Sequence, residues 1–240
     1  MAEHPLIKQL SVRSRISQEE QNALLQAVGG TREIAADEEF IREGSIPSES
    51  IFLLRGFAAR YKNTPSGKRQ IVALHIKGDF VDLHSFLLKK MDHGVFAMSA
   101  CTIAWVPHDR LREITERFPH LTRQLWLSTL VDAAIHREWL VGLGRRSALQ
   151  NLSHLLCELF VRLSTVDEVA GYTFRLPITQ EELADARGMS IVHLNRSVQE
   201  LRARGLITWR GDEVTINDWD RLADLAEFDP TYLNLDVKSR

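Results

Sequence analysis

The sequence has few cysteines and no long apolar run, and both shortages exclude classes of protein. Only two of the 240 residues are cysteine, Cys101 and Cys157. Two are too few for a disulfide framework or a four-cysteine iron–sulfur site, so we expect ordinary buried thiols in a reducing cytoplasm. No apolar run reaches the roughly 18 residues of a membrane-spanning helix. The start, Met-Ala-Glu-His-Pro, lacks the basic-then-apolar pattern of a signal peptide.

An excess of positive charge is also absent. The chain has 30 Lys and Arg against 32 Asp and Glu, a formal net charge of −2, so bulk charge gives no sign of nucleic-acid binding. The sequence has no internal repeats and no low-complexity tract. It also lacks a nucleophile elbow and a glycine-rich phosphate loop, and we therefore expect no enzymatic activity. A length of 240 residues with 44% hydrophobic content predicts one or two domains with substantial cores.

Residues 178–207 predict two short helices joined by a tight turn. Thr179 is followed three positions later by Glu182, which is the spacing of a capping box. Gly188 falls where the first helix must end with a positive φ, a conformation that glycine adopts without a Cβ penalty. Ser190 is then the N-cap of the second helix. Two short helices connected in this way form a helix–turn–helix.

The second of these helices has an apolar side and a polar side. Apolar residues recur at helical spacing on the inner side: Leu194, Val198 and Leu201. The opposite side carries residues that suit the edges of base pairs: Ile191, Val192, Asn195, Arg196 and Gln199. Arginine can pair with guanine, asparagine and glutamine with adenine, and an aliphatic side chain can touch a thymine methyl group. We therefore predict that this helix reads the major groove of DNA.

Residues 205–216 extend this unit. Two short apolar runs flank Gly211-Asp212, which predicts a β-hairpin and hence a winged helix. Residues 175–212 contain six arginines and five acidic residues, so this region has almost no net charge. The prediction of DNA binding therefore depends on where the charged side chains lie and not on their number. The alternative is a small helical domain in which Arg196 is only a solvated charge.

The region 38–106 has a different character. Short apolar runs are separated by turn-forming residues, which is typical of a small antiparallel roll or barrel. The runs are 40–41, 51–54, 57–61, 71–74, 80–81, 95–98 and 101–106.

Helical patterns follow the predicted roll. A short helix is expected from Asp109 to Arg117, a long one from Pro119 to about Leu143, and another over 148–163, with a hinge at the glycines of 142–146. The apolar residues of the long helix cover more than one of its faces, which favours one face on the roll and one on a second subunit. The candidate dimer residues are Leu127, Leu130, Val131, Ile135 and Trp139. The alternative is a single deeply buried core helix.

This order of elements resembles the Crp/Fnr family of bacterial transcription regulators over nearly the whole chain. The resemblance is carried by residues 178–207, by Gly78-Asp79-Phe80, by Arg55-Gly56 and by the helix containing 155–159. It implies an α+β fold with a cyclic-nucleotide-binding-like roll at 1–117, a dimerisation helix and hinge at 118–145, and a winged helix–turn–helix at 146–240. It also implies a homodimer on double-stranded DNA with a near-palindromic site, and RNA polymerase as a further partner.

The resemblance also implies roles for individual residues. The family reads bases from positions that correspond to Ile191, Val192 and Arg196 here, and Thr179 matches its phosphate-contacting cap. The first two depart from the Arg–Glu pair of the cyclic-AMP receptor branch, so the half-site should differ. The complete set of predicted DNA-binding residues is Thr179, Gln180, Ser190, Ile191, Val192, Asn195, Arg196 and Gln199.

The sensor side departs further from the family pattern. Leu83 stands where cyclic-AMP binders have a ribose-binding Glu, and Gly94-Val95 stands near the position of their phosphate-binding Arg-Ser. Burying a cyclic phosphate without a cation is costly, so we expect no cyclic nucleotide. The effector-pocket candidates are Gly78, Asp79, Asp82, Leu83 and His84.

Other cofactors are not expected either. The spacing of His75, His84 and His93 matches no metal template, which favours surface or hydrogen-bonded histidines over a metal or haem site. The N-terminal cysteine cluster of oxygen-sensing family members is absent.

The sequence thus predicts a cytoplasmic, homodimeric, sequence-specific transcription regulator that an unidentified small molecule or redox signal controls through the roll. Two alternatives stay open. One is a ligand-binding module whose winged helix docks a protein partner. The other is an effector-independent regulator with a vestigial pocket.

Overall fold

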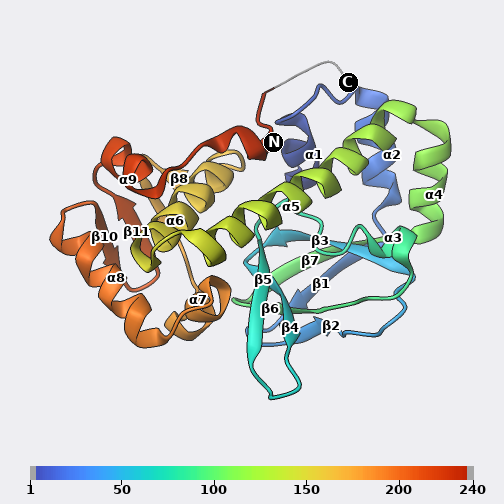
Figure 1. Ribbon diagram of the computed structural model, residues 1–240. Coiled ribbons are helices and arrows are strands. Elements are labelled where there is room, and N and C mark those ends of the chain that lie inside the picture. The colour runs from blue at the N-terminus through green and yellow to red at the C-terminus, as the bar shows by residue number, and fades with distance from the viewer. Residues whose placement is uncertain (1–3, 237–240) are drawn as a thin grey trace. The chain divides into compact units, whose positions relative to one another are not determined.

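The computed structural model describes residues 4–236 (Figure 1). Residues 1–3 and 237–240, at the outer ends of the first and last predicted domains, lie outside the described residues. The chain divides into two compact units: one holds the chain up to Lys62, Ala73–Ala133 and the end from Asn234, and the other holds Asn63–Val72 and Ala134–Leu233. The division falls within the long helix α5 (Pro119–Arg145).

The predicted antiparallel roll is confirmed and consists of two sheets. One has the strand order β1-β7-β3 and the other β2-β6-β4-β5. The strands are β1 (Gly30–Ile34), β2 (Glu39–Ile41), β3 (Glu49–Arg55), β4 (Ala58–Asn63), β5 (Arg69–His75), β6 (Gly94–Ala97) and β7 (Cys101–Pro107). The expected run at 80–81 contributes only an isolated bridge between Phe52 and Phe80. The sequence missed β1 because three of its five residues are exposed and give no alternation.

Two apolar clusters hold the first unit together. One lies between the strands and includes Ile51, Leu53, Val95 and Ile103. The other joins β3 and β7 to the helices α1 (Pro5–Ser11), α2 (Gln18–Ala27) and α4 (His108–Arg117) and to the start of α5, with Phe52 fully buried in it. Cys101 and Cys157 are both buried free thiols, as expected, and burial raises the pKa of Cys157 to about 12.

The long predicted helix and its successor are both present, and the chain breaks between them at the end of the predicted hinge segment. Gly142 and Gly144 lie inside the last turns of α5, and the break before α6 (Ala148–Ser164) comes at Arg146-Ser147. The helix break therefore lies at the end of the predicted hinge segment 142–146, and the two glycines themselves are helical. A Cβ at Gly142 would stand 2.7 Å from Asn151 Oδ1, so this glycine permits close packing of α5 on α6.

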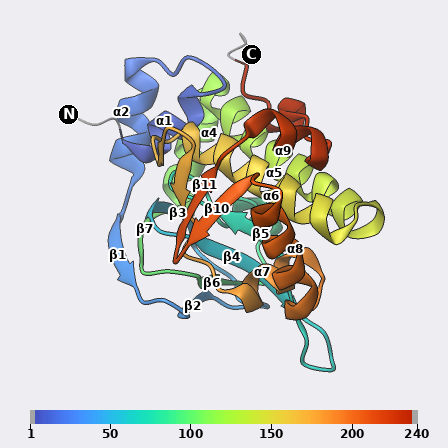
Figure 2. The ribbon, with the colours of Figure 1, turned by 90° about the vertical axis from the view of Figure 1, so that its left-hand side faces the viewer.

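The second unit contains the predicted winged helix. Its helices are α7 (Gln180–Arg187), α8 (Ile191–Ala203) and α9 (Trp219–Ala226), followed by a 3₁₀ turn at Pro230–Leu233. Its sheet has the order β10-β11-β9-β8, with β8 (Val169–Ala170), β9 (Thr173–Arg175), β10 (Ile207–Arg210) and β11 (Glu213–Ile216). Figure 2 shows β10 and β11 side by side as the two arrows of the wing. The sequence did not predict β8, β9 or α9. Between residues 4 and 236, no helix combines the length and the apolar character needed to span a bilayer.

Candidate DNA-binding surface and effector site

The turn between α7 and α8 is built as the sequence indicates. The Glu182 N–H donates to Thr179 Oγ1 (3.2 Å) and the Thr179 N–H donates to Glu182 Oε2 (2.7 Å), which completes the capping box. Gly188 ends α7 in the left-handed conformation, with φ 60° and ψ 35°. Ser190 then caps α8 by accepting from the His193 N–H (3.3 Å). These local contacts fix the angle at which α8 leaves α7.

The two sides of α8 are arranged as the sequence indicates. Leu194, Val198 and Leu201 are buried, while Ile191 is 44% and Val192 67% exposed. The remaining candidates for DNA contact are also exposed, apart from a half-buried Asn195: Thr179, Gln180, Ser190, Arg196 and Gln199. Short exposed side chains and backbone amides therefore surround the starts of α7 and α8, where a phosphate can approach. Arg196 lies one turn further along α8.

The arginines of this region differ in their availability. Three are engaged at the surface by their own chain: Arg175 with Asp212, Arg202 with the Trp209 carbonyl, and Arg204 with Glu200. Arg196 and Arg210 are exposed, and within residues 4–236 neither has an ion-pair partner. Arg210 lies at the tip of the wing, and the sequence reasoning counted it without giving it a role. These two side chains supply the accessible positive charge of the region.

The sixth arginine, Arg187, is 2% exposed and does not face solvent. Its guanidinium carbon lies 4.3 Å from the ring centroid of Trp139, a cation–π contact between the end of α7 and the last third of α5. Burial lowers the pKa of Arg187 to about 10. Its carbonyl accepts from Asn151 Nδ2 (3.3 Å). Arg187 therefore anchors α7 and is unavailable to DNA.

Glu158 of α6 lies beside this contact and is fully buried. Its carboxylate accepts from Trp139 Nε1 (3.2 Å), from Arg162 Nη1 (3.1 Å) and from the Tyr232 hydroxyl (3.0 Å). Burial and the neighbouring Glu158 carboxylate raise the pKa of Tyr232 above its ordinary value. We call Trp139, Glu158, Arg162, Arg187 and Tyr232 the buried polar cluster. It ties α5, α6, α7 and the 3₁₀ turn together.

The candidate dimer residues on α5 fall into two groups. Val131, Ile135 and Trp139 are buried against their own chain, so they have little surface left for a partner. Leu127 is half-buried and Leu130 is 51% exposed. The candidate dimer residues did not include the other large apolar side chains that α5 exposes: Trp126, Leu140, Val141 and Leu143.

Four of the five effector-pocket candidates have structural contacts of their own. Gly78 turns the chain with φ 90° close to Pro5, and Asp79 accepts from Gln9 Nε2 (2.8 Å) and from the Ile76 N–H (2.9 Å). Asp82 is fully buried and accepts from the Ile51 N–H (2.6 Å), and burial raises its pKa to about 7. Leu83 belongs to an apolar cluster.

The fifth candidate, His84, lies beside His93, with ring centroids 5.0 Å apart. His93 Nδ1 and Asp92 Oδ1 are 2.7 Å apart. Burial lowers the pKa of His84 to about 4 and also lowers that of His93, and the positive charge of Arg60 acts in the same direction on both. Both imidazoles are therefore neutral at pH 7.

Arg60 of β4 is a buried charged residue near the effector-pocket candidates that the sequence reasoning missed. It is buried; its Nε donates to the Val81 carbonyl (2.7 Å) and its Nη1 pairs with Asp132 of α5. The roll therefore does contain a buried cation, although it is already paired. An arginine within the apolar run 57–61 was the signal that could have revealed it.

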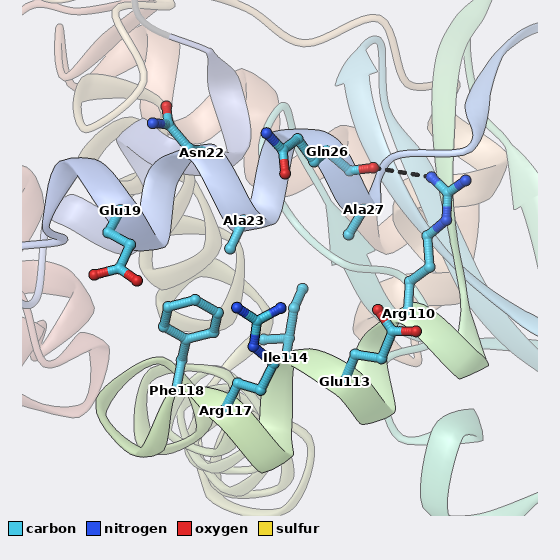
Figure 3. A pocket seen from close by; sticks show the side chains of 10 residues that line it. All are labelled: Glu19, Asn22, Ala23, Gln26, Ala27, Arg110, Glu113, Ile114, Arg117 and Phe118. Atoms are coloured by element: carbon cyan, nitrogen blue, oxygen red, sulfur yellow. Dashed lines mark hydrogen bonds between the residues drawn. The ribbon is translucent and has the colours of Figure 1, made fainter.

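A groove of about 460 Å³ lies between α2 and α4 (Figure 3). Its lining is strongly charged and includes Glu19, Glu113, Arg110 and Arg117. Arg110 Nη1 donates to the Gln26 carbonyl (2.9 Å). The groove includes none of the effector-pocket candidates. Its charge favours a solvated surface over a binding site for an apolar ligand.

Comparison with known proteins agrees with both units. Residues 31–118 match the cyclic nucleotide-binding domain family and residues 150–225 match the Crp-like helix-turn-helix domain family. A "Probable transcriptional activator" of Rhizobium leguminosarum bv. viciae is 30% identical over 176 residues, covering 73% of this chain and 72% of that protein. Transcriptional activator protein FnrL of Cereibacter sphaeroides is 27% identical over 211 residues, covering 86% of this chain and 84% of that protein.

Among solved structures, FixK2 from Bradyrhizobium japonicum has the same fold. It superposes with a TM-score of 0.75 at 21% identity, covering 82% of this chain and 96% of that chain. The roll, the long helix and the winged helix, together with these matches, identify a DNA-binding regulator and not an enzyme. The chain belongs to the Crp/Fnr family of transcription regulators.

Proposed function

We propose that this protein binds a near-palindromic DNA site as a homodimer in the cytoplasm and acts on RNA polymerase at promoters. The observation that supports this best is the exposed side of α8, where Arg196 is accessible and Ile191 and Val192 lie one turn before it. DNA binding itself needs no cofactor in this proposal. An effector that acts through the roll would alter the balance between arrangements of the two units.

Each residue of the surface has a proposed part in recognition. Arg196 pairs with a guanine, and Ile191 and Val192 contact thymine methyl groups in the same half-site. Asn195 and Gln199 flank these contacts. The starts of α7 and α8, at Thr179, Gln180 and Ser190, hold phosphates and set the register. We add Arg210 at the tip of the wing as a further phosphate contact.

For the dimer we propose the exposed apolar side of α5, with Trp126 and Leu130 as its central residues and Leu127 at its margin. Trp126 is 64% exposed and stands one turn before Leu130, so the two form a continuous stripe. In a two-fold dimer the same patch of both copies makes contact, and one apolar stripe can pack against a second copy of itself. This interface replaces the buried Val131, Ile135 and Trp139 of the sequence-based prediction.

Selection of bound sequences from random duplex DNA tests the proposal. We expect enrichment of two inverted half-sites about one helical turn apart, each with a guanine. An asymmetric or single half-site would reject the dimer, and no enrichment over random duplex would reject sequence-specific DNA binding. The alternative in which the winged helix docks a protein predicts the latter result, together with little dependence of DNA retention on salt.

The dimer has its own test. Leu130→Glu places a charge in the proposed stripe, and we expect the dimer dissociation constant to rise at least tenfold in analytical ultracentrifugation. Leu87→Glu is the matched control, because Leu87 is 75% exposed on the short helix α3 (Ser85–Leu88), outside α5. Equal behaviour of the two variants would place the interface elsewhere.

A further inference from the structure

Two histidines and an aspartate from the end of the predicted roll lie together. His84 precedes α3, and Asp92 and His93 precede β6. One potential ligand atom from each of the three lies within 4.8 Å of the others. Among residues 4–236, no other group of His, Cys, Asp or Glu has this geometry. The nine-residue separation of the histidines in sequence gave no indication of it.

The histidines have unused nitrogen atoms. His84 Nε2 and His93 Nε2 are both shielded from solvent and have no hydrogen-bond partner among the described residues. His93 is only 8% exposed. Leaving a buried polar atom without a partner costs free energy, and an ion is one of the groups that can satisfy such an atom. One cation between the two imidazoles would satisfy both nitrogens.

We propose that His84, Asp92 and His93 form a binding site for a divalent transition-metal ion of borderline softness, with zinc as the reference ion. The imidazole Nε2 atoms are the ligands. Asp92 Oδ1 holds His93 through Nδ1, which is the carboxylate–histidine arrangement that orients metal ligands in proteins. Water or an exogenous ligand fills the remaining positions. Asp92 is exposed and gives the ion a route from solvent.

The chemistry of the donors favours this kind of ion. Imidazole nitrogen suits zinc, iron, nickel and copper, whereas calcium and magnesium prefer oxygen ligands. The histidines must be neutral to bind a cation. The charges of Asp92 and Asp132 act on both imidazoles with a sign opposite to that of Arg60. An incoming cation would therefore meet two carboxylates as well as one guanidinium.

The position of the site also suggests what the ion does. The positive charge of Arg60 is felt by both histidines. The same Arg60 side chain forms an ion pair with Asp132 of α5. A divalent ion beside Arg60 competes with it for Asp132 and weakens the link from β4 to the helix that carries the proposed dimer stripe. This regulatory step, unlike the metal site itself, rests on the proposed function.

Metal binding is tested on the full-length protein without DNA. Protein stripped with a chelator and then freed of it is titrated with zinc chloride in a calorimeter, and cobalt(II) replaces zinc for visible spectroscopy. We expect one ion per chain and cobalt d–d bands of a nitrogen-containing site. His84→Gln and His93→Gln should each lower the affinity at least tenfold, and Asp92→Asn by about tenfold.

His75→Gln is the matched control, since His75 is a buried histidine of the same roll outside the cluster. It should bind zinc as the unaltered chain does. Absence of saturable binding to the unaltered chain overturns the proposal, and so does equal binding by the doubly substituted His84→Gln/His93→Gln protein. The cobalt spectrum of the unaltered chain decides the matter even if a variant fails to fold.

A second measurement separates the site from the proposed function. Affinity for the selected DNA is compared with and without zinc. A shift that His93→Gln abolishes supports the regulatory step. Unchanged DNA affinity with intact metal binding overturns the regulatory step alone, and no DNA binding in either state overturns the proposed function while the metal site stands.

Discussion

Arg187 and Arg196 are nine residues apart in one helix–turn–helix, yet their surroundings are opposite. Arg196 lies exposed on α8, whereas Arg187 is buried against Trp139 at the end of α7. One is placed to meet a ligand and the other holds the helix that positions it. The comparison teaches that residue type and proximity in sequence do not assign a role. The surroundings of each arginine assign its role, and four measurements test this contrast.

The largest effect is expected in the buried polar cluster. Glu158→Leu removes a buried carboxylate that accepts from Arg162, Trp139 and Tyr232. We expect a loss of about 3–5 kcal/mol in the free energy of unfolding. Urea titration followed by tryptophan fluorescence measures it. Glu200→Gln, in an exposed pair with Arg204, should cost about 1 kcal/mol or less. Similar losses in both variants would remove the distinction between the buried cluster and the surface.

The exposed side of α8 should show the reverse pattern. Arg196→Ala should weaken binding to the selected DNA by about 1–3 kcal/mol and leave the unfolding free energy nearly unchanged. A gel-shift titration measures the first quantity and urea titration the second. The control is Arg204→Ala, since Arg204 is already paired with Glu200. Unchanged DNA affinity of Arg196→Ala would remove this residue from base recognition.

A pH dependence should come from His154, which lies in α6 near the buried polar cluster. Burial, followed by the charges of Arg146 and Arg187, lowers its pKa to about 3. The unfolded chain, with a pKa near 6.5, therefore takes up a proton first as the pH falls. Stability is fully present above about pH 6.5 and is lost progressively towards pH 3, by about 1–2 kcal/mol over the first one to two pH units.

The groups that face His154 are Glu138 at 3.7 Å, the two arginines and the rings of Phe228 and Tyr232. His154→Phe removes the titrating group and should flatten the pH dependence of the urea midpoint. Unaltered steepness in this variant would assign the acid sensitivity to another group.

The smallest expected effect is a difference in thermal stability between two glycine substitutions, one of them at the turn between α7 and α8. Gly188→Ala forces a Cβ into the left-handed region, which costs about 1–2 kcal/mol, and this Cβ would lie 2.7 Å from Leu143 Cδ2. Gly211 also has a positive φ, but a Cβ added there would meet no atom within 4 Å, so Gly211→Ala is the matched control. Thermal melting should show the larger loss for Gly188→Ala, and equal losses would mean that Leu143 moves aside at no cost.

The sequence predicted which candidate DNA-contact residues are accessible far better than it predicted the surroundings of the effector-pocket candidates. All eight candidates for DNA contact lie at the surface or half-buried, because the periodicity of α8 assigned its faces. The sensor candidates came from positions after Gly78, and most of them turned out to have structural contacts. The pair of His84 and His93 and the buried Arg60 became visible only in the fold.

The sequence by itself determined the helix caps, the turn at Gly188 and the inner stripe of α8. These features depend on interactions over about four residues, whose geometry the backbone fixes. Only the tertiary structure decided that Arg187 meets Trp139, that Arg60 meets Asp132 of α5, and that α5 exposes Trp126 but not Trp139. Burial and partner depend on segments dozens of residues away, and no local pattern contains that information.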